Sequence, residues 1–325
     1  MEGLDLKDRK ILYELDINAR QPDSRIAKKV GLSREVVRYR IHRLQEEGYI
    51  NYFLTTLNSM KLGFIWFRTF FKFQNLGTQK EEEILEWLRR QSSWMTQVEG
   101  PWDVNTGIFC RTVYEFRDIL SEFFMNYGTY LERYWTSIVT RMWHYHRGYL
   151  LNKKESKADV MGYEPGEKYV PVTIDRTDYK ILQKLAKNAR MKTIDIAREI
   201  EATEIMVRHR IKKMIENGVI LGFRPFLNIN KLGYSYFKVH IKLQNLTEER
   251  KNHILSFIHQ HLHIIYLTEL VGGADVEIEF QVRTNDELYQ YLKELRERFP
   301  DLIRDYEFMQ YTKEYKFTYL PEKGI

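Results

Sequence analysis

The chain repeats itself, and this repeat limits the possible folds more than any other feature. At an offset of 170 residues, "DRKILYELDINAR" (8–20) matches "DYKILQKLAKNAR" (178–190), and "LNSMKLGF" (57–64) matches "LNINKLGY" (227–234). Past residue 76 the offset becomes 172, and the match continues. The 325 residues are therefore two copies of one unit of roughly 150 residues, too long and too few for a solenoid array.

Composition indicates a soluble protein of a reducing compartment. The single cysteine, Cys110, excludes an internal disulfide framework and any Cys-based zinc site. The N-terminus has no apolar signal core, and the longest apolar run is interrupted by Arg68 and Lys72. We therefore expect a cytoplasmic protein. The formal net charge of +6 is a mild bias, so only local clusters of basic residues can indicate a polyanionic partner.

The first fifty residues of each copy predict three helices. In the first copy Asp5 can cap the first helix, residues 23–30 form the second, and Gly31 follows at a tight turn. Ser33 can then cap a third helix that ends at Gly48. The second copy places Asp175, residues 194–200, Thr203 and Gly218 at the corresponding positions. The β-rich stretches that follow, 49–57 and 219–227, are expected to form wings.

The third helix of each copy has an apolar stripe and a basic face. In the first copy Val37, Ile41 and Leu44 recur at helical spacing and should be buried. A short two-helix turn followed by a basic helix is the helix-turn-helix pattern, which places that helix in a DNA major groove. Arg38 and Arg208 are the strongest candidates for DNA contact. The full predicted set is Ser33, Arg34, Arg38, Tyr39, His42 and Arg43 in the first copy and Thr203, Glu204, Arg208, His209, Lys212 and Lys213 in the second.

The remainder of each copy changes to the period of strands. "YSYFKVHIKLQ" (234–244) alternates apolar and polar residues, whereas the equivalent stretch 64–74 is apolar on nearly both faces and predicts a strand covered on both sides. Helical and β-type segments then follow in the order βαββαβ, the ferredoxin-like unit. The predicted fold class is α+β, with two tandem units, each a winged helix-turn-helix followed by a ferredoxin-like domain.

These residues resemble a known family. The pattern of Leu-Asp, "KIL", "NAR", "VGLS" and "RI" in the first unit, followed by a βαββαβ domain, is similar to the Lrp/AsnC (feast/famine) transcription regulators. The resemblance covers each copy, and the second departs where "IEAT" (200–203) replaces the glycine of the turn. It implies double-stranded DNA as partner and a RAM-type domain that dimerises and binds small effectors, often amino acids. It implies no catalytic residue and no cofactor.

The family usually dimerises by packing two such sheets together, so two units in one chain imply a covalent pseudo-dimer. A short linker makes that pairing intramolecular, at an effective concentration on the order of millimolar. The pseudo-dimer could assemble further. Aromatic residues of the two copies are expected to bury each other's outer sheet faces: Trp66, Phe70, Trp143 and Tyr145 against Tyr236, Tyr311, Tyr315 and Phe317.

The family's effector turn has the form G-x-x-D. The corresponding effector-binding residues here are Gly100, Trp102 and Asp103 in the first copy and Gly272, Gly273 and Asp275 in the second. A plain β-turn explains the same residue types, so both interpretations stay open. Because Trp102 and Ala274 differ greatly in size, the two turns cannot form equivalent pockets.

The predicted domains follow from the repeat. They are a winged helix-turn-helix domain (1–58), a ferredoxin-like effector and dimerisation domain (59–150), a polar linker (151–173), a second winged helix-turn-helix domain (174–228) and a second ferredoxin-like domain (229–325).

Two alternatives compete with a regulator. Siroheme decarboxylases resemble these regulators end to end, but their corresponding turn carries a histidine with a nearby asparagine, which this chain lacks. The other alternative is a metabolite-sensing protein whose DNA-binding heads are vestigial. We predict no metal site: His259, His261 and His263 straddle a predicted helix end, and His144 and His146 have no histidine counterparts in the second copy. Cys110 is expected in the core.

Overall fold

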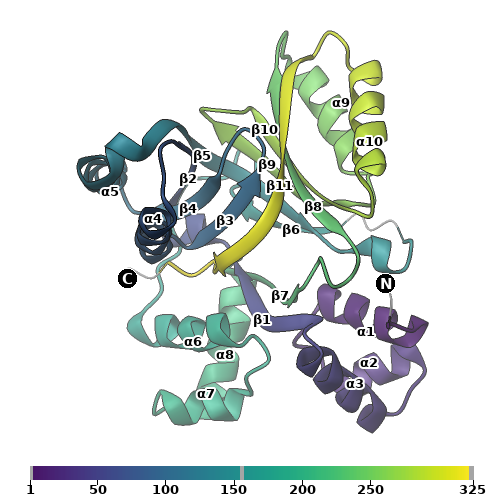
Figure 1. Cartoon of the computed structure of the whole chain (residues 1–325). Coiled ribbons are helices and arrows are strands. Elements are labelled where there is room, and N and C mark those ends of the chain that lie inside the picture. Colours follow the sequence, from purple (N-terminus) through teal and green to yellow (C-terminus); the bar gives the residue numbers. More distant parts are fainter. Residues whose placement is uncertain (1–2, 154–156, 322–325) are drawn as a thin grey trace.

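A computed structural model describes residues 3–153 and 157–321. Each unit begins with a three-helix head, which we call head 1 and head 2, and continues into a βαββαβ domain, so the predicted fold class is confirmed (Figure 1). Head 1 consists of α1 (Leu6–Ile17), α2 (Asp23–Val30) and α3 (Arg34–Glu46), and head 2 of α6 (Arg176–Lys187), α7 (Thr193–Glu199) and α8 (Glu204–Glu216).

The heads form as the capping residues predict. The side chain of Asp5 accepts a hydrogen bond from the backbone N–H of Asp8, and the side chain of Asp8 accepts one from the backbone N–H of Asp5, which completes a capping box; Asp175 and Asp178 repeat it. Gly31 ends α2 with φ +68°, a left-handed conformation that glycine adopts without strain. Glu201 stands at the equivalent place with φ +56°, so head 2 keeps the turn at the cost of a strained side-chain-bearing residue.

The strands after the heads do not form a wing within their own unit. Strand β1 (Ile50–Leu57) pairs antiparallel with β7 (Ile220–Leu227) of the other unit, for example Phe53 with Pro225. We call this two-stranded element the ribbon. Each head rests on the partner strand: the Ala19 N–H donates to Phe223 O of β7 (2.7 Å), and the Ala189 N–H donates to Phe53 O of β1 (3.0 Å).

The other strands form one nine-stranded sheet within the described residues, and eight of them close into a ring. Their order is β2-β4-β3-β11-β8-β10-β9-β5, with β5 returning to pair with β2, and β6 lies outside β5. The four helices α4, α5, α9 and α10 cover the outside of the ring (Figure 1). The bounds are β2 Ile65–Phe73, α4 Thr78–Gln91, β3 Trp94–Glu99, β4 Val104–Cys110, α5 Val113–Tyr127, β5 Leu131–Tyr145, β6 Ala158–Gly162, β8 Ser235–Leu243, α9 Glu248–Ile258, β9 Ile264–Val271, β10 Val276–Val282, α10 Asn285–Arg298 and β11 Ile303–Phe317.

Two long strands exchange between the units and close the ring. The first half of β5 pairs with β2 of its own unit, and its second half pairs with β9 of the other; β11 pairs first with β8 and then with β3. The expected burial of aromatic residues between the two sheets is therefore correct for only part of the set. Trp143 and Tyr145 pack instead with the helix-covered core of unit 2, and Tyr315 with that of unit 1, because the exchanged half of each strand lies beneath the other unit's helices.

The segment between the units is more than a linker. Residues 154–156 of it lie outside the described range, but β6 extends the sheet by pairing with the second half of β5, from Arg141 with Gly162 to Tyr145 with Ala158. The sequence did not predict this strand, because its polar neighbours and glycines match a loop.

Candidate nucleic-acid interface and ligand turns

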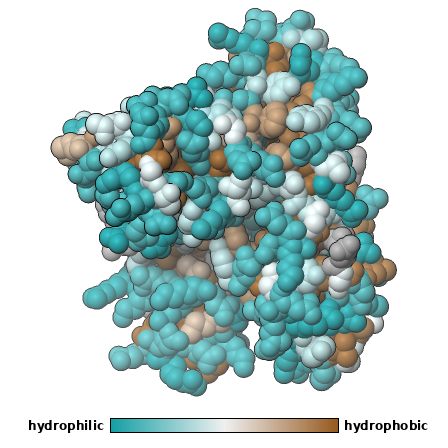
Figure 2. Space-filling view, in the orientation of Figure 1, coloured by the Kyte–Doolittle hydropathy of each residue, from teal (hydrophilic) through white to brown (hydrophobic). Residues whose placement is uncertain are grey.

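The predicted recognition faces are on the surface of both heads. The apolar stripe of α3 is buried as predicted, and so is that of α8 (Val207, Ile211 and Met214). Ser33 and Thr203 cap these helices by accepting hydrogen bonds from Val36 (3.3 Å) and Met206 (3.2 Å). Hydrophilic side chains cover most of the two heads in Figure 2. Exposed residues on these faces are Ser33, Arg34, Arg38, Tyr39 and His42 on head 1 and Thr203, Arg208, His209, Lys212 and Lys213 on head 2; Glu204 is half-buried.

Several arginines beside these faces form ion pairs within their own head. Arg40 contacts Asp5 and Asp8 (both 2.8 Å), and Arg210 contacts Asp175 (2.6 Å) and Asp178 in the same way. Arg43, which we predicted to contact DNA, donates to the buried Asp8 at 2.6 Å. These pairs tie the third helix to the first, so the side chains are already committed to a structural role.

The strongest DNA candidates carry weaker, solvent-exposed pairs. Arg38 lies 3.5 Å from Asp23, and Arg208 lies 2.7 Å from Glu204, with the arginine side chains 63% and 70% exposed. Exposed pairs of this kind contribute little to stability, so a phosphate can replace the carboxylate at low cost. Among the residues that the structure describes, Arg34 and Lys213 have no acidic side chain within ion-pair distance.

The two heads are fastened to one another by reciprocal hydrogen bonds. The Arg20 guanidinium donates to the carbonyls of Ala189 (2.7 Å) and Met191 (2.6 Å) in head 2. Arg190, its counterpart, donates to the carbonyl of Ala19 (2.6 Å) and to the Asp23 carboxylate (2.5 Å) in head 1. Sequence reasoning missed this contact, although the repeated "NAR" contained both arginines. The contact joins the segments that follow α1 and α6, and it thereby connects the two heads directly.

Head 1 is also anchored to the ring by a buried ionic network. The fully buried Asp16 of α1 accepts from Arg147 at 2.6 Å and lies 3.7 Å from Arg224 of β7. Arg224 reaches onward to Asp159 of β6 at 2.8 Å. Burial opposes the charge of Asp16, but Arg147, His146 and Arg224 lower its pKa well below the usual range. The sequence offered one sign of this: Asp16 stands four residues after Leu12, on the helix face that the apolar stripe buries.

The ring encloses charged residues where a hydrophobic core would be usual. Lys238 contacts Glu277 (2.7 Å) and Glu279 (2.9 Å), and Arg68 of the other unit contacts the same two carboxylates. We call these four residues the buried charge cluster. Burial alone would raise the pKa of Glu277, but Lys238 and Arg68 lower it to about 2. Both glutamates are therefore ionised and paired at neutral pH.

The predicted effector turns meet at the end of the ring away from the heads. Trp102 is buried between Phe70 and Trp135, and its indole N–H donates to Glu307 (2.9 Å). On the other side a side chain at Gly273 would collide with Trp135, 2.9 Å away. Both turns thus lie against Trp135, one from each unit.

The acidic residues of the turns are in use. Asp103 accepts hydrogen bonds from Lys72 Nζ (2.6 Å) and from the Phe73 N–H (2.8 Å). Asp275 accepts from the Leu243 N–H (2.7 Å). Gly100 and Gly272 both have positive φ values, +137° and +84°, and each approaches the backbone of the partner unit. The structure therefore gives each aspartate a role in fastening its turn.

The remaining histidines and the cysteine are integrated into packing. His259 contacts the Tyr145 hydroxyl, and His263 Nδ1 lies 2.8 Å from Gln281 O. His144 is buried and stacks on Tyr266. Cys110 is buried at the end of β4, as expected. Over residues 3–153 and 157–321, no three His, Cys, Asp or Glu side chains are grouped so as to hold a metal ion.

Comparisons with known proteins agree with this architecture. The model of the AsnC-type helix-turn-helix domain matches residues 4–45, and that of a winged helix-turn-helix DNA-binding domain matches residues 174–220. The transcriptional regulator LrpA of Bacillus subtilis is 32% identical over 125 residues, which are 38% of this chain and 89% of that protein. LrpA of Pyrococcus horikoshii is 31% identical over 116 residues, 32% of this chain and 82% of the relative. The chain belongs to the Lrp/AsnC family of transcription regulators.

Each of these Lrp relatives matches about one unit, so this Lrp/AsnC protein contains the family's usual module twice. Its two heads are DNA-binding domains of that family. A solved structure shares the tandem arrangement: the siroheme decarboxylase NirDL aligns with a TM-score of 0.64 over 97% of this chain and 93% of its own, at 13% identity. That likeness shows a common fold. None of the helices in the described part of this Lrp/AsnC protein is both long and apolar enough to cross a membrane.

Proposed function

We propose that the chain is a sequence-specific transcription regulator that binds double-stranded DNA as a covalent pseudo-dimer. The observation that carries this proposal is the reciprocal contact of Arg20 and Arg190, which fixes two exposed basic helices, α3 and α8, relative to one another. In a dimeric helix-turn-helix protein the two recognition helices enter successive major grooves about one turn apart. Here one polypeptide supplies both.

The two recognition faces differ, so we propose an asymmetric operator. Head 1 presents Arg34 where head 2 presents Glu204, and this exchange reverses the charge at the start of the helix. Tyr39 and His42 are replaced by His209 and Lys212. Because each side chain reads a different base edge, the two half-sites should have different sequences.

Selection of bound sequences from a random DNA pool, followed by a footprint with base-by-base substitution, tests both proposals. We expect a site of two unlike half-sites about ten base pairs apart, bound by one chain. Equal base preferences in the two half-sites contradict the asymmetric operator. Binding of random DNA at low salt with no preferred site indicates vestigial heads and contradicts the regulator.

We further propose that a small metabolite such as an amino acid modulates DNA binding through the Gly100–Asp103 and Gly272–Asp275 turns. The support is their position, since both lie against Trp135 where the units meet. The large Trp102 side chain occupies the space beside the first turn, so the second turn is the better candidate for the metabolite site. Calorimetric titration with each amino acid, repeated with Gly273→Val, tests this: binding that survives this substitution unchanged contradicts the assignment.

A tetrapyrrole decarboxylase is the second candidate, and the similarity of fold to NirDL along the whole chain favours it. The side chains favour the regulator, because the turns contain Trp102 and Ala274 in place of a histidine. Anaerobic incubation with siroheme, followed by absorption spectroscopy and product analysis, separates the two. Turnover of siroheme by the purified protein would establish the enzyme, whereas an unchanged spectrum supports the regulator.

A further inference from the structure

A cleft lies between the head-side end of the ring and the ribbon. Its upper wall comes from ring strands of both units, including Trp66, Trp94 and Tyr266, and its floor is formed by Leu54 of β1 and Phe226 of β7. The cavity volume is about 30 Å³, which admits a group the size of a few water molecules at most. It is separate from the effector turns, which close the opposite end of the ring.

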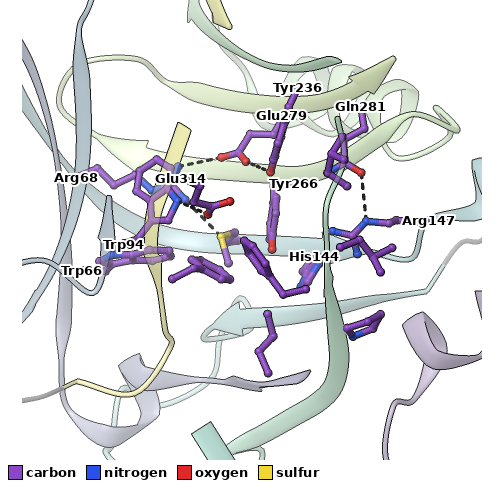
Figure 3. Close-up of a pocket in the computed structure, with 17 residues that line it drawn as sticks. Trp66, Arg68, Trp94, His144, Arg147, Tyr236, Tyr266, Glu279, Gln281 and Glu314 are labelled. Carbon is purple, nitrogen blue, oxygen red and sulfur yellow. Dashed lines mark hydrogen bonds and ion pairs between the residues drawn. The ribbon is translucent and has the colours of Figure 1, made fainter. Parts of the chain in front are cut away.

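The cleft contains one carboxylate that has no cation. Glu314 of β11 is exposed to it and points into it (Figure 3), with one oxygen accepting from the Trp94 indole N–H at 3.2 Å. In the described part of the chain no lysine, arginine or histidine lies within ion-pair distance of Glu314. Burial and the nearby Glu279 raise the pKa of Glu314 to about 8 because no cation offsets the cost of its charge, so an ammonium ligand would bind the ionised form and displace the carboxyl proton.

The other charged groups in the cleft wall are already neutralised. Glu279 is paired with Lys238 and Arg68, and it also accepts from the Tyr236 hydroxyl at 2.6 Å. Arg147 is paired with Asp16. An anionic ligand would therefore find no free cation and would meet Glu314. A cationic ligand would find the one unpaired carboxylate.

Two buried polar groups at the cleft also lack partners. The Nε2 atom of His144 and the amide nitrogen of Gln281 make no hydrogen bond, although both side chains are at least 98% buried. Burial, together with Arg224 and Arg147, lowers the pKa of His144 well below its usual range, so the ring is neutral, and with its proton on Nδ1 the Nε2 atom can accept a hydrogen bond. A neutral imidazole nitrogen and a carboxylate oxygen are both acceptors for an ammonium N–H.

We propose that this cleft binds a small organic cation, a primary ammonium group held by Glu314 among aromatic side chains. Aromatic walls favour an alkylammonium over a bare metal ion, because calcium, magnesium and similar hard cations require several oxygen ligands and this cleft offers one free carboxylate. The volume admits the ammonium head and one or two carbons. A longer chain would extend through the opening between ring and ribbon.

Calorimetric titration of the full chain with ethylammonium chloride tests the proposal, with sodium chloride at equal concentration as the control for ionic strength. We expect saturable binding to the wild-type protein, weakened at least tenfold by Glu314→Gln. Asp305→Asn removes a charge from the exposed start of the same strand, outside the cleft, and should leave binding unchanged. Circular dichroism establishes that each variant is folded.

A second variant keeps the test decisive if Glu314→Gln does not fold. Leu54→Phe enlarges a side chain of the cleft floor, without changing any charge, and should abolish ethylammonium binding by filling the space. The proposal is overturned if the wild-type protein shows no saturable binding, or if binding persists unchanged in both variants. DNA binding is not part of this measurement, so its failure leaves the proposed regulator function intact.

Discussion

The two heads of the molecule are attached to the ring in chemically different ways. Head 1 is held by the buried network of Asp16, Arg147 and Arg224. At the equivalent positions head 2 has uncharged residues, Ala186, Tyr319 and Leu54. The first helix of head 2 instead contacts the segment after β11, where the Tyr179 hydroxyl donates to Pro321 O at 3.1 Å. A cavity of about 380 Å³ lies between α6 and this segment.

This difference shows what fusion of two copies permits. In a symmetric dimer every interface residue appears twice, so the two subunits cannot place different residues at equivalent positions of the interface. In this chain Arg68 and Lys238 occupy equivalent positions, but both their partners come from unit 2, because unit 1 has Asn105 and Gly107 in place of Glu277 and Glu279. Four carboxylates in that space would repel one another.

The largest expected effect is the loss of the head 1 anchor. Asp16→Ala leaves two buried arginines without their carboxylate, and we expect it to lower the free energy of unfolding by about 4 kcal/mol, measured by denaturant titration. Ala186→Ser changes the equivalent position of head 2 and should stay within about 0.5 kcal/mol. Equal losses for the two variants would show that the heads are attached in the same way.

Glu277→Gln tests the buried charge cluster, with an expected loss of about 3 kcal/mol at pH 7 because Lys238 and Arg68 lose a charged partner. Since the folded-state pKa of Glu277 is lowered to about 2, its stabilisation is present above the unfolded-state pKa of about 4.3 and is lost as pH falls toward 2. The free energy of unfolding, measured at several pH values, should therefore depend less on pH over this range in Glu277→Gln than in the wild-type protein. The exposed Glu132→Gln should behave like wild type, and a wild-type pH dependence in Glu277→Gln rules out this role for the cluster.

Arg34→Ala and Arg208→Ala compare the two recognition faces. If each arginine contacts a phosphate, we expect each substitution to weaken DNA binding by roughly three- to tenfold and to reduce the slope of log K against log salt by about 1. Fluorescence anisotropy over a range of salt concentrations measures both quantities. Arg117→Ala, on α5 far from the heads, is the control. Affinity and slope that remain at the wild-type values exclude the residue from the interface.

The smallest expected effect concerns the left-handed residues that follow α2 and α7, Gly31 in head 1 and Glu201 in head 2. Glu201→Gly should stabilise head 2 by about 0.5–1 kcal/mol, because glycine adopts positive φ without the cost that a side chain adds. Gly31→Ala should destabilise head 1 by a similar amount. Thermal unfolding of both variants checks the signs, and a loss of stability in Glu201→Gly contradicts the left-handed turn there.

The sequence predicted the local structure of both units because caps and periodicity depend on neighbours in the chain. Asp5, Ser33 and Gly31 have the predicted roles, and the βαββαβ order is confirmed. The apolar stripe of each third helix was enough to predict which face of that helix is exposed. The contact of Arg43 with Asp8 could not be predicted, because the sequence does not show that these two residues lie side by side.

The sequence could not predict how the units exchange strands. Pairing of β1 with β7, and of β5 with β9, joins residues more than a hundred positions apart, and a single repeated pattern cannot indicate which copy a strand will join. For the same reason the polar face of "YSYFKVHIKLQ" gave no sign that Lys238 is buried inside a closed ring. The buried network at Asp16 depends on three separate segments and was equally out of reach.

The central claim is that one chain reads two unlike half-sites, one with each head. The most direct test is a footprint on a selected operator and on two variants of it, in each of which one half-site is replaced by a copy of the other, while the stoichiometry is measured by sedimentation. We predict one chain per operator, protection of both half-sites, and loss of binding when either half-site is replaced by a copy of the other. Two chains per operator, or equal affinity for the duplicated half-sites, would contradict the account.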